Sequence, residues 1–370
     1  MLRSLAAELP IRSFNLHISE TALADLRERL ARTRFADEPP LEPWSTGTSL
    51  AHLRELVAYW RDGFDWRAHE ARINRLRQFT VPVHGIELHF IHEPGSGINA
   101  TPLLLSHGWP GSIVEFLELI PLLTERFTVV APSLPGYTLS FKPGQPRFGV
   151  EEIADCFAEL MTRLGYERFA VQGGDWGAFI GSRLAAKYPQ RVIGLHLNLL
   201  AVRRDPKIAA TSPEEAEYLR HLAHWLKDET GYQAIQGTKP QTLAYALTDS
   251  PAGLAAWIAE KFHTWSDGGI QRDDVLANIS LYWFTGAIGS SFWPYHARLH
   301  RSWPFETVGV PVGYAEFPKE ILRPPRSLAA KTYTDIRRWT VMQKGGHFAA
   351  LEEPRALAGE IVELFTSLGG

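Results

Sequence analysis

Short apolar runs alternate with helical stretches from about residue 85 to about residue 200, and this alternation constrains the fold more than any other feature. The apolar runs predict strands at 86–91, 102–105, 127–131, 169–171 and 192–196, with helices at 113–123, 150–164 and 178–187 between them. Short buried strands that alternate with helices of about 10 to 15 residues are typical of βαβ units. Because their crossovers are almost always right-handed, helices cover both faces of the sheet. The sequence therefore predicts an α/β fold with a mainly parallel sheet.

The first 84 residues follow a different pattern, which is mostly helical and has few strand signals. Ser19 can cap a helix that carries Leu23, Leu26 and Leu30 on one face, and a second helix is expected over 50–60. We expect this segment to wrap around another part of the molecule.

The alternation also stops between about 201 and 305, where helical spacing and aromatic residues predominate. Strand patterns resume at 310–314 and 339–342, and a closing helix is expected over 352–368. The expected organisation is an N-terminal segment (1–84), a core in two parts (85–200 and 306–370) and a helical cap inserted between them (201–305).

Charge and cysteine content exclude several classes of protein. With 38 Lys and Arg against 41 Asp and Glu, the net charge is −3, which disfavours a dedicated nucleic-acid binder. The single cysteine, Cys156, excludes an internal disulfide and a zinc site built on paired thiolates. Its place in a helical apolar pattern predicts a buried structural thiol. No apolar run approaches the roughly 18 residues of a membrane span, so we expect a soluble, cytoplasmic protein.

A Gly-Gly-Asp-Trp-Gly motif at 173–177 lies between a predicted strand and a predicted helix. In the strand–turn–helix elbow of α/β-hydrolases, glycines flank a nucleophile held on a strained turn. Asp175 occupies the nucleophile position here. The same residues also fit a tight turn with an Asp helix cap, so this motif alone does not decide between the two interpretations.

Two further motifs follow other strands in the order that this fold requires. A Ser-His-Gly-Trp-Pro-Gly-Ser motif at 106–112 offers the backbone N–H of Trp109, which together with that of Trp176 can form an oxyanion hole. A Gly-Gly-His-Phe motif at 345–348 places His347 where the fold has its general base. Because these motifs follow predicted strands, they are expected to meet at the carboxyl edge of the sheet, where open α/β sheets bind ligands.

The acid partner of His347 is expected on the loop that follows the strand ending near Tyr314. Glu316 and Glu320 both qualify, and their spacing does not separate them. Asp335 precedes the last strand and is therefore expected at the opposite end of the sheet.

An aspartate nucleophile suits displacement at saturated carbon, which leaves an alkyl ester on Asp175 that water activated by His347 then hydrolyses. An epoxide leaves as a basic alkoxide and needs an acid such as a phenol, for which the cap offers Tyr232 and Tyr295. A halide needs N–H donors instead, and Trp109 and Trp176 can supply them. A haloalkane dehalogenase is therefore the chemical alternative, and a non-catalytic hydrolase-like binding protein is the alternative from another class.

Over nearly its whole length the sequence resembles the epoxide hydrolases of microsomal type. The resemblance rests on the three motifs above and on stretches at 231–236, 290–295 and 317–322. It implies an α/β-hydrolase fold with a helical cap and a helical N-terminal extension. It also implies that Tyr232 and Tyr295 activate the epoxide oxygen and that Glu320 is the acid, with Glu316 as the fallback.

The resemblance further implies a cofactor-independent enzyme, without a metal, that acts on a small epoxide and water. The sequence departs from the microsomal relatives in lacking an N-terminal hydrophobic anchor, so membrane association is not expected. No nucleic-acid partner is expected either, and a homo-oligomer is compatible with the sequence.

Overall fold

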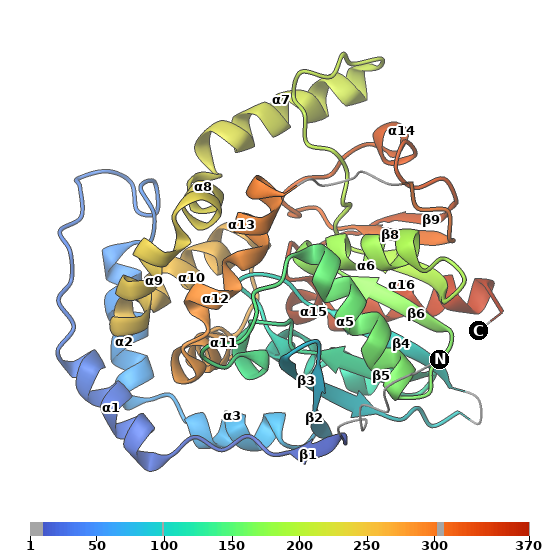
Figure 1. The fold of residues 1–370 in the computed structure, drawn as a ribbon. Coiled ribbons are helices and arrows are strands. Elements are labelled where there is room, and N and C mark those ends of the chain that lie inside the picture. The colour runs from blue at the N-terminus through green and yellow to red at the C-terminus, as the bar shows by residue number, and fades with distance from the viewer. Residues whose placement is uncertain (1–9, 98–99, 302–306, 370) are drawn as a thin grey trace.

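One mixed sheet organises the molecule, for which a computed structural model describes residues 10–97, 100–301 and 307–369 (Figure 1). In this part of the chain, nine strands lie in the order β1-β2-β3-β5-β4-β6-β7-β8-β9. Their bounds are β1 (Arg12–Phe14), β2 (Gln78–Val83), β3 (Ile86–Glu93), β4 (Thr101–Ser106), β5 (Phe127–Pro132), β6 (Phe169–Gly173), β7 (Val192–Leu197), β8 (Val312–Glu316) and β9 (Ile336–Val341). The pairs β1–β2, β2–β3 and β3–β5 are antiparallel. The remaining pairs, from β5–β4 to β8–β9 along the sheet, are parallel. The predicted mainly parallel sheet is confirmed.

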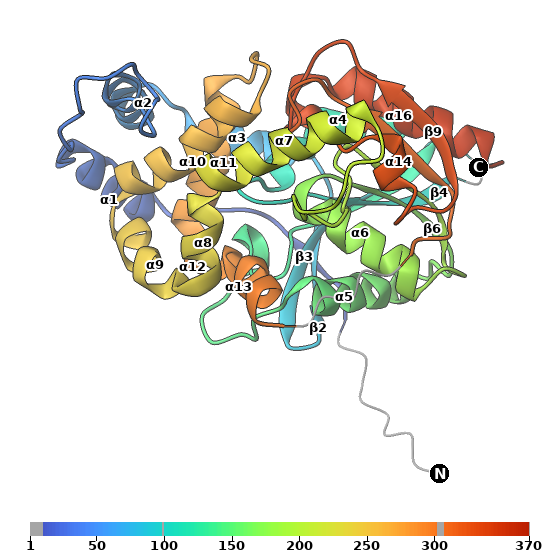
Figure 2. The same cartoon turned by 90° about the horizontal axis from the view of Figure 1, so that it is seen from above.

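Helices cover both faces of this sheet, as the crossover rule predicts. Figure 2 shows the strands between α16 (Pro354–Ser367) on one side and α5 (Val150–Arg163) and α6 (Asp175–Lys187) on the other. Cys156 lies on the buried face of α5, as expected for a structural thiol. The helix predicted over 113–123 is instead split into a 3₁₀ turn, η1 (Ile113–Phe116), and α4 (Leu119–Leu123).

In the described part of the first 84 residues helices predominate, as predicted, but strand β2 was not predicted. Strand β2 pairs with β3 along its whole length, and β1 pairs with β2. The pattern of β2 is hidden because Gln78 and Thr80 are polar but buried, and Pro82 interrupts the run. Strand propensity depends on pairing and burial, which local sequence does not reveal. The sheet therefore extends into the N-terminal segment.

The helices of this segment are α1 (Glu20–Ala31), α2 (Leu50–Asp62) and α3 (Trp66–Ile73). Helix α1 begins as predicted, because the side chain of Ser19 accepts a hydrogen bond from the Ala22 N–H. Helices α1 and α2 pack against α10 (Pro251–Trp265), and the Tyr59 hydroxyl donates to Asp273 at 2.8 Å. The N-terminal segment thus wraps around the helices inserted in the core.

These inserted helices, called here the cap segment, lie beside the sheet, and the first of them extends across the top in Figure 1. They are α7 (Pro213–Asp228), α8 (Gly231–Thr238), α9 (Pro240–Asp249), α10, α11 (Arg272–Thr285), α12 (Ile288–Ser291) and α13 (Trp293–His300). Short helices η2 (Thr138–Ser140), α14 (Arg326–Ala329) and α15 (Ala349–Glu352) lie in the core. The predicted boundary at 305 and 306 lies outside the described residues, and the division into domains stays a prediction.

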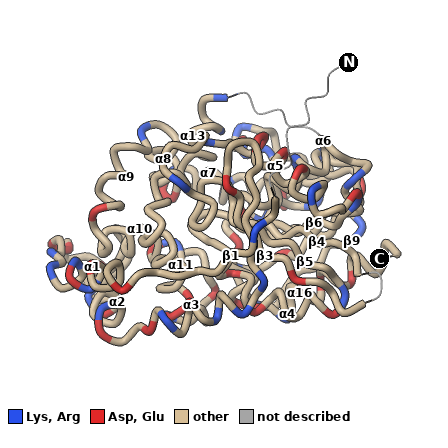
Figure 3. Tube along the Cα trace, turned by 60° about the horizontal axis from the view of Figure 1, so that its bottom comes forward, with Lys and Arg blue, Asp and Glu red and all other residues tan. Residues whose placement is uncertain are grey.

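Charged residues are interspersed along the outer helices and form no large patch of one sign in the view of Figure 3. Many of them pair locally, as Arg29 does with Asp25 one helical turn away. Among the described helices, none is long and apolar enough to cross a lipid bilayer.

Candidate active site

Asp175 stands at the turn between β6 and α6, where its backbone adopts a positive φ of 47°. This left-handed region is costly for residues other than glycine, so the surrounding chain must hold the turn. Close packing does so, because a Cβ at Gly177 would lie only 1.9 Å from the Ser106 carbonyl oxygen. The elbow predicted from the Gly-Gly-Asp-Trp-Gly motif is therefore present.

The two carboxylate oxygens of Asp175 face different groups. Oδ1 accepts a hydrogen bond of 2.7 Å from the Trp109 N–H, and Oδ2 lies 3.6 Å from His347 Nε2. Only glycine fits at position 108, since a Cβ there would lie 2.2 Å from Oδ1. Trp176 follows Asp175 in the first turn of α6, where backbone N–H groups have no partner inside the helix.

The cap segment holds the loop that carries Trp109. The Asn278 side chain in α11 donates to the Pro110 carbonyl at 2.8 Å, and the Tyr282 hydroxyl donates to the Gly111 carbonyl at 2.8 Å. Both donors are buried. These bonds fix the direction of the Trp109 N–H toward Asp175.

His347 is held by its side-chain partner and by its backbone. Its Nδ1 lies 2.7 Å from Glu320 Oε1, and both side chains are almost fully buried. The backbone N–H of His347 donates to the Trp265 carbonyl of the cap segment at 2.9 Å. Glu320 reaches His347 because Lys319 and Gly346 form an isolated bridge between their loops.

Glu316, the fallback acid, points elsewhere. It accepts a hydrogen bond of 3.1 Å from Trp339 Nε1 and lies 3.8 Å from Arg323. The geometry thus places Glu320, and not Glu316, beside the imidazole.

Charges around His347 favour its protonated form. Burial by itself lowers the pKa of His347, but the nearby carboxyls of Glu320, Asp175 and Glu115 outweigh it and raise the pKa to about 9. The loss of the negative charge of Glu320 or of Asp175 would lower the pKa of His347 again.

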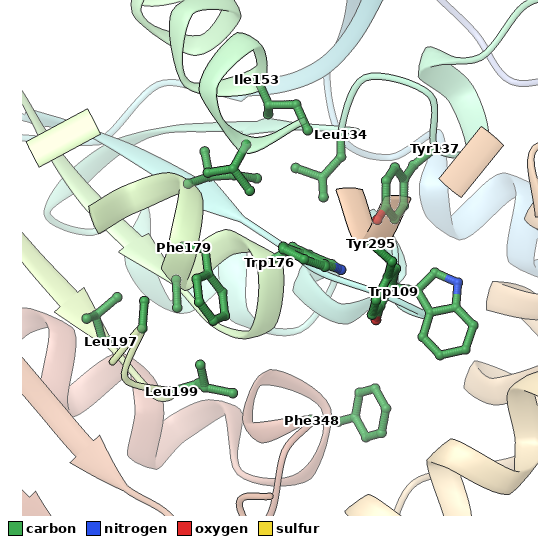
Figure 4. Close-up of a cluster of buried hydrophobic side chains, with 14 of the residues drawn as sticks. Trp109, Leu134, Tyr137, Ile153, Trp176, Phe179, Leu197, Leu199, Tyr295 and Phe348 are labelled. Atoms are coloured by element: carbon green, nitrogen blue, oxygen red, sulfur yellow. The ribbon is translucent and has the colours of Figure 1, made fainter. Parts of the chain in front are cut away.

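Tyr232 in α8 and Tyr295 in α13 lie together on the other side of Asp175, with ring centroids 5.7 Å apart. Figure 4 shows Tyr295 between the indole rings of Trp176 and Trp109, to which its ring centroid lies at 4.8 and 5.8 Å. Tyr232 stacks on Trp109 at 5.4 Å. Burial raises the pKa of both phenols above the usual range, so both stay protonated near neutral pH.

Two spaces meet at the Asp175 carboxylate. A narrow pocket next to Trp176, Tyr232 and Tyr295 has about 280 Å³ of empty space, its open mouth included. On the other side of the carboxylate, a cavity lined by His347 and Glu115 has about 20 Å³ open to water molecules. That volume is enough for one water.

Glu115 was not singled out from the sequence. Burial is the main cause that raises the pKa of Glu115 to about 8; the nearby charge of His347 acts against it and that of Asp175 adds to it. The signal that could have found it is an ionisable residue inside the apolar run Ile113-Val114-Glu115-Phe116, directly after the Trp109 motif.

The residues that the sequence predicts for the site lie together around the Asp175 carboxylate in the structure. Besides Asp175 they are His347, Glu320, Tyr232, Tyr295, Trp109 and Trp176.

Comparisons with known proteins match this architecture. The family model for the epoxide hydrolase N terminus matches residues 11–116, and the model for the alpha/beta hydrolase fold matches residues 101–272. Epoxide hydrolase 1 of Sus scrofa is 37% identical over 96% of this chain and 88% of its own length.

Two solved structures are similar over almost the whole chain. The structure of Aspergillus niger epoxide hydrolase has a TM-score of 0.88 and 31% identity and covers 98% of both chains. Juvenile hormone epoxide hydrolase from the silkworm Bombyx mori has a TM-score of 0.89 and 32% identity and covers 98% of this chain and 95% of its own. Sequence motifs, fold and full-length similarity therefore agree that this chain belongs to the epoxide hydrolases, enzymes of the α/β-hydrolase fold.

Proposed function

We propose that the enzyme converts an epoxide to a vicinal diol through an alkyl ester on Asp175. The observation that carries this proposal is the position of the Asp175 carboxylate, between the imidazole of His347 and a pocket lined by two phenols. In the first step a carboxylate oxygen attacks a ring carbon, and the bond from that carbon to the epoxide oxygen breaks. The resulting alkoxide takes a proton from Tyr295 or Tyr232.

The high pKa of these phenols is compatible with this role, because an alkoxide is a stronger base than a phenolate. Two phenols can share the developing negative charge, and neither needs to ionise before ring opening. The site thus supplies an acid where an epoxide needs one.

Ester formation also prepares the second step. It removes the negative charge of Asp175, so the pKa of His347 falls and the imidazole can accept a proton from water. We place that water in the cavity between His347 and Glu115. It attacks the carbonyl carbon of the ester, and the N–H groups of Trp109 and Trp176 stabilise the oxyanion. When this intermediate collapses, the bond from the carbonyl carbon to the oxygen that joins it to the substrate breaks, and the departing alkoxide takes the proton from His347 to complete the diol. Asp175 keeps one oxygen from water, and its carboxyl proton returns to the phenolate left by the first step.

An assay with two substrates tests the proposed function. With styrene oxide we expect phenylethanediol, and with 1-bromobutane we expect no bromide release. Bromide release without diol formation would favour a haloalkane dehalogenase. The absence of both products would favour a non-catalytic ligand-binding protein.

Replacing Tyr295 by Phe should slow ester formation about 10- to 100-fold, because one of the two proton donors is lost. Hydrolysis of the ester should change much less. Rapid-quench single-turnover experiments separate the two rates. Tyr245→Phe is the control, since this tyrosine of α9 is 71% exposed, and equal effects of both variants would remove Tyr295 from the proposal.

Replacing Glu320 by Gln should move the acid limb of the kcat–pH profile to lower pH. Glu320 raises the pKa of His347, and ester hydrolysis needs His347 neutral, so a lower pKa frees the base at lower pH. The plateau should fall about 10- to 100-fold, because a less well oriented base is weaker. Glu316→Gln should leave limb and plateau unchanged, and a shift in that variant instead would reverse the assignment.

A further inference from the structure

Two arginines line the same pocket as Asp175, Tyr232 and Tyr295. They are Arg204, which precedes the cap helices, and Arg298 in α13, and both are half-buried. The Arg298 guanidinium lies 5.3 Å from the ring centroid of Phe179. That of Arg204 lies 5.5 Å from the same ring and 5.2 Å from Trp225. Aromatic faces, which attract cations, thus hold both groups at one wall of the pocket.

Neither guanidinium has a carboxylate partner among the described residues, although arginines elsewhere in the protein do. Arg72, for example, pairs with Glu118 and Asp274, and Arg338 pairs with Glu360. Burial, together with the nearby charge of Arg204, lowers the pKa of Arg298 to about 10. The Asp175 carboxylate in the same pocket acts against this lowering, but it forms no ion pair with either guanidinium in the described structure. The two like charges repel each other, and an anion bound between them would offset that repulsion.

We propose that Arg204 and Arg298 form an anion subsite and that the preferred substrate is an epoxide that carries a carboxylate. This inference rests on the proposed function, because it places the carboxylate at one wall of the pocket and the epoxide ring at Asp175. The planar guanidinium fork matches the two oxygens of a carboxylate, which distinguishes an arginine pair from lysines at such a site.

The pocket as it stands is narrow, with only about 10 Å³ open to water molecules. An incoming substrate therefore requires side chains that line the pocket to move, and the long side chains of Arg204 and Arg298 can move outward. This movement breaks no ion pair within the described part of the chain, since ring faces alone hold the guanidinium groups. The same groups can then close on the carboxylate.

A different role for the two arginines would be to make the phenols more acidic. Arg204 does lower the pKa of Tyr232, but burial and the Asp175 charge have the larger effect and the pKa remains raised. The two roles differ in their consequences. Support of the phenols acts on every epoxide, whereas an anion subsite acts only on substrates with a carboxylate.

The test compares terminal epoxy acids of four, six and eight carbons with their primary amides, which have the same shape and no charge. For the best-fitting chain length, the wild-type enzyme should prefer the acid about 10- to 100-fold in kcat/KM. Arg298→Met and Arg204→Met should reduce this acid-to-amide ratio at least tenfold, mainly through KM. Arg203→Met is the matched control, because Arg203 is 68% exposed and pairs with Asp205, and its ratio should equal that of wild type.

Arg298→Lys should restore part of the preference, because it restores the positive charge, and it also covers the case that Arg298→Met folds poorly. The inference is overturned if no acid in the series is preferred to its amide. It is also overturned if the arginine variants lower acid and amide turnover by the same factor. If the wild-type enzyme opens neither acids nor amides nor styrene oxide, the proposed function itself fails.

Discussion

Replacing Asp175 by Ala should lower epoxide turnover by about 10⁴-fold or more, because the carboxylate that forms the ester is lost. The geometry supports this size of effect. The Asp175 carboxylate accepts a hydrogen bond from the Trp109 N–H and lies between His347 and the pocket lined by Tyr232 and Tyr295. Its removal therefore takes away the group on which the ester is both formed and hydrolysed. Initial rates of diol formation from styrene oxide measure the loss.

A second variant guards against a folding defect. Position 175 has a positive φ, which asparagine tolerates better than alanine does. Asp175→Asn should therefore keep the wild-type melting temperature and lose turnover to a similar extent. If either folded variant kept a tenth of wild-type activity, Asp175 would not be the nucleophile.

Replacing His347 by Gln should separate the two chemical steps. Ring opening needs the Asp175 carboxylate and the phenols, so one equivalent of epoxide should still react. Hydrolysis needs the base, so steady-state turnover should fall about 10³-fold or more. Intact-mass measurement should then show a gain equal to one epoxide, located by digestion on the peptide that contains Asp175.

The control is His224→Gln, since His224 lies in α7 with 70% of its side chain exposed. That variant should accumulate no adduct and should keep normal turnover. Full multiple-turnover activity in His347→Gln, or an adduct on a different residue, would contradict the assigned role.

The core of the site could be predicted because its motifs are local. Asp175, Trp109 and His347 each follow a strand and stand among glycines, and the parallel order of the strands brings such positions to one edge. Spacing within one loop could not separate Glu316 from Glu320. That choice depends on the bridge between Lys319 and Gly346, which joins residues far apart in the sequence.

Other features could not be predicted either, because contacts between residues far apart in the sequence define them. Strand β2 becomes a strand by pairing with β3, and its buried polar residues conceal this from a local pattern. Arg204 and Arg298 are nearly a hundred positions apart, and only the fold shows that both line the pocket next to Asp175. Glu115 is likewise recognised as a site residue only from the cavity that it lines together with His347.

The ester mechanism transfers an oxygen atom from Asp175 to the product. In a single turnover in H₂¹⁸O with enzyme in excess over styrene oxide, the diol should contain ordinary oxygen. The label should appear in the carboxylate of Asp175, detected by mass spectrometry of its peptide. Label in the diol, with none in Asp175, would show direct attack of water on the epoxide and would contradict the ester mechanism.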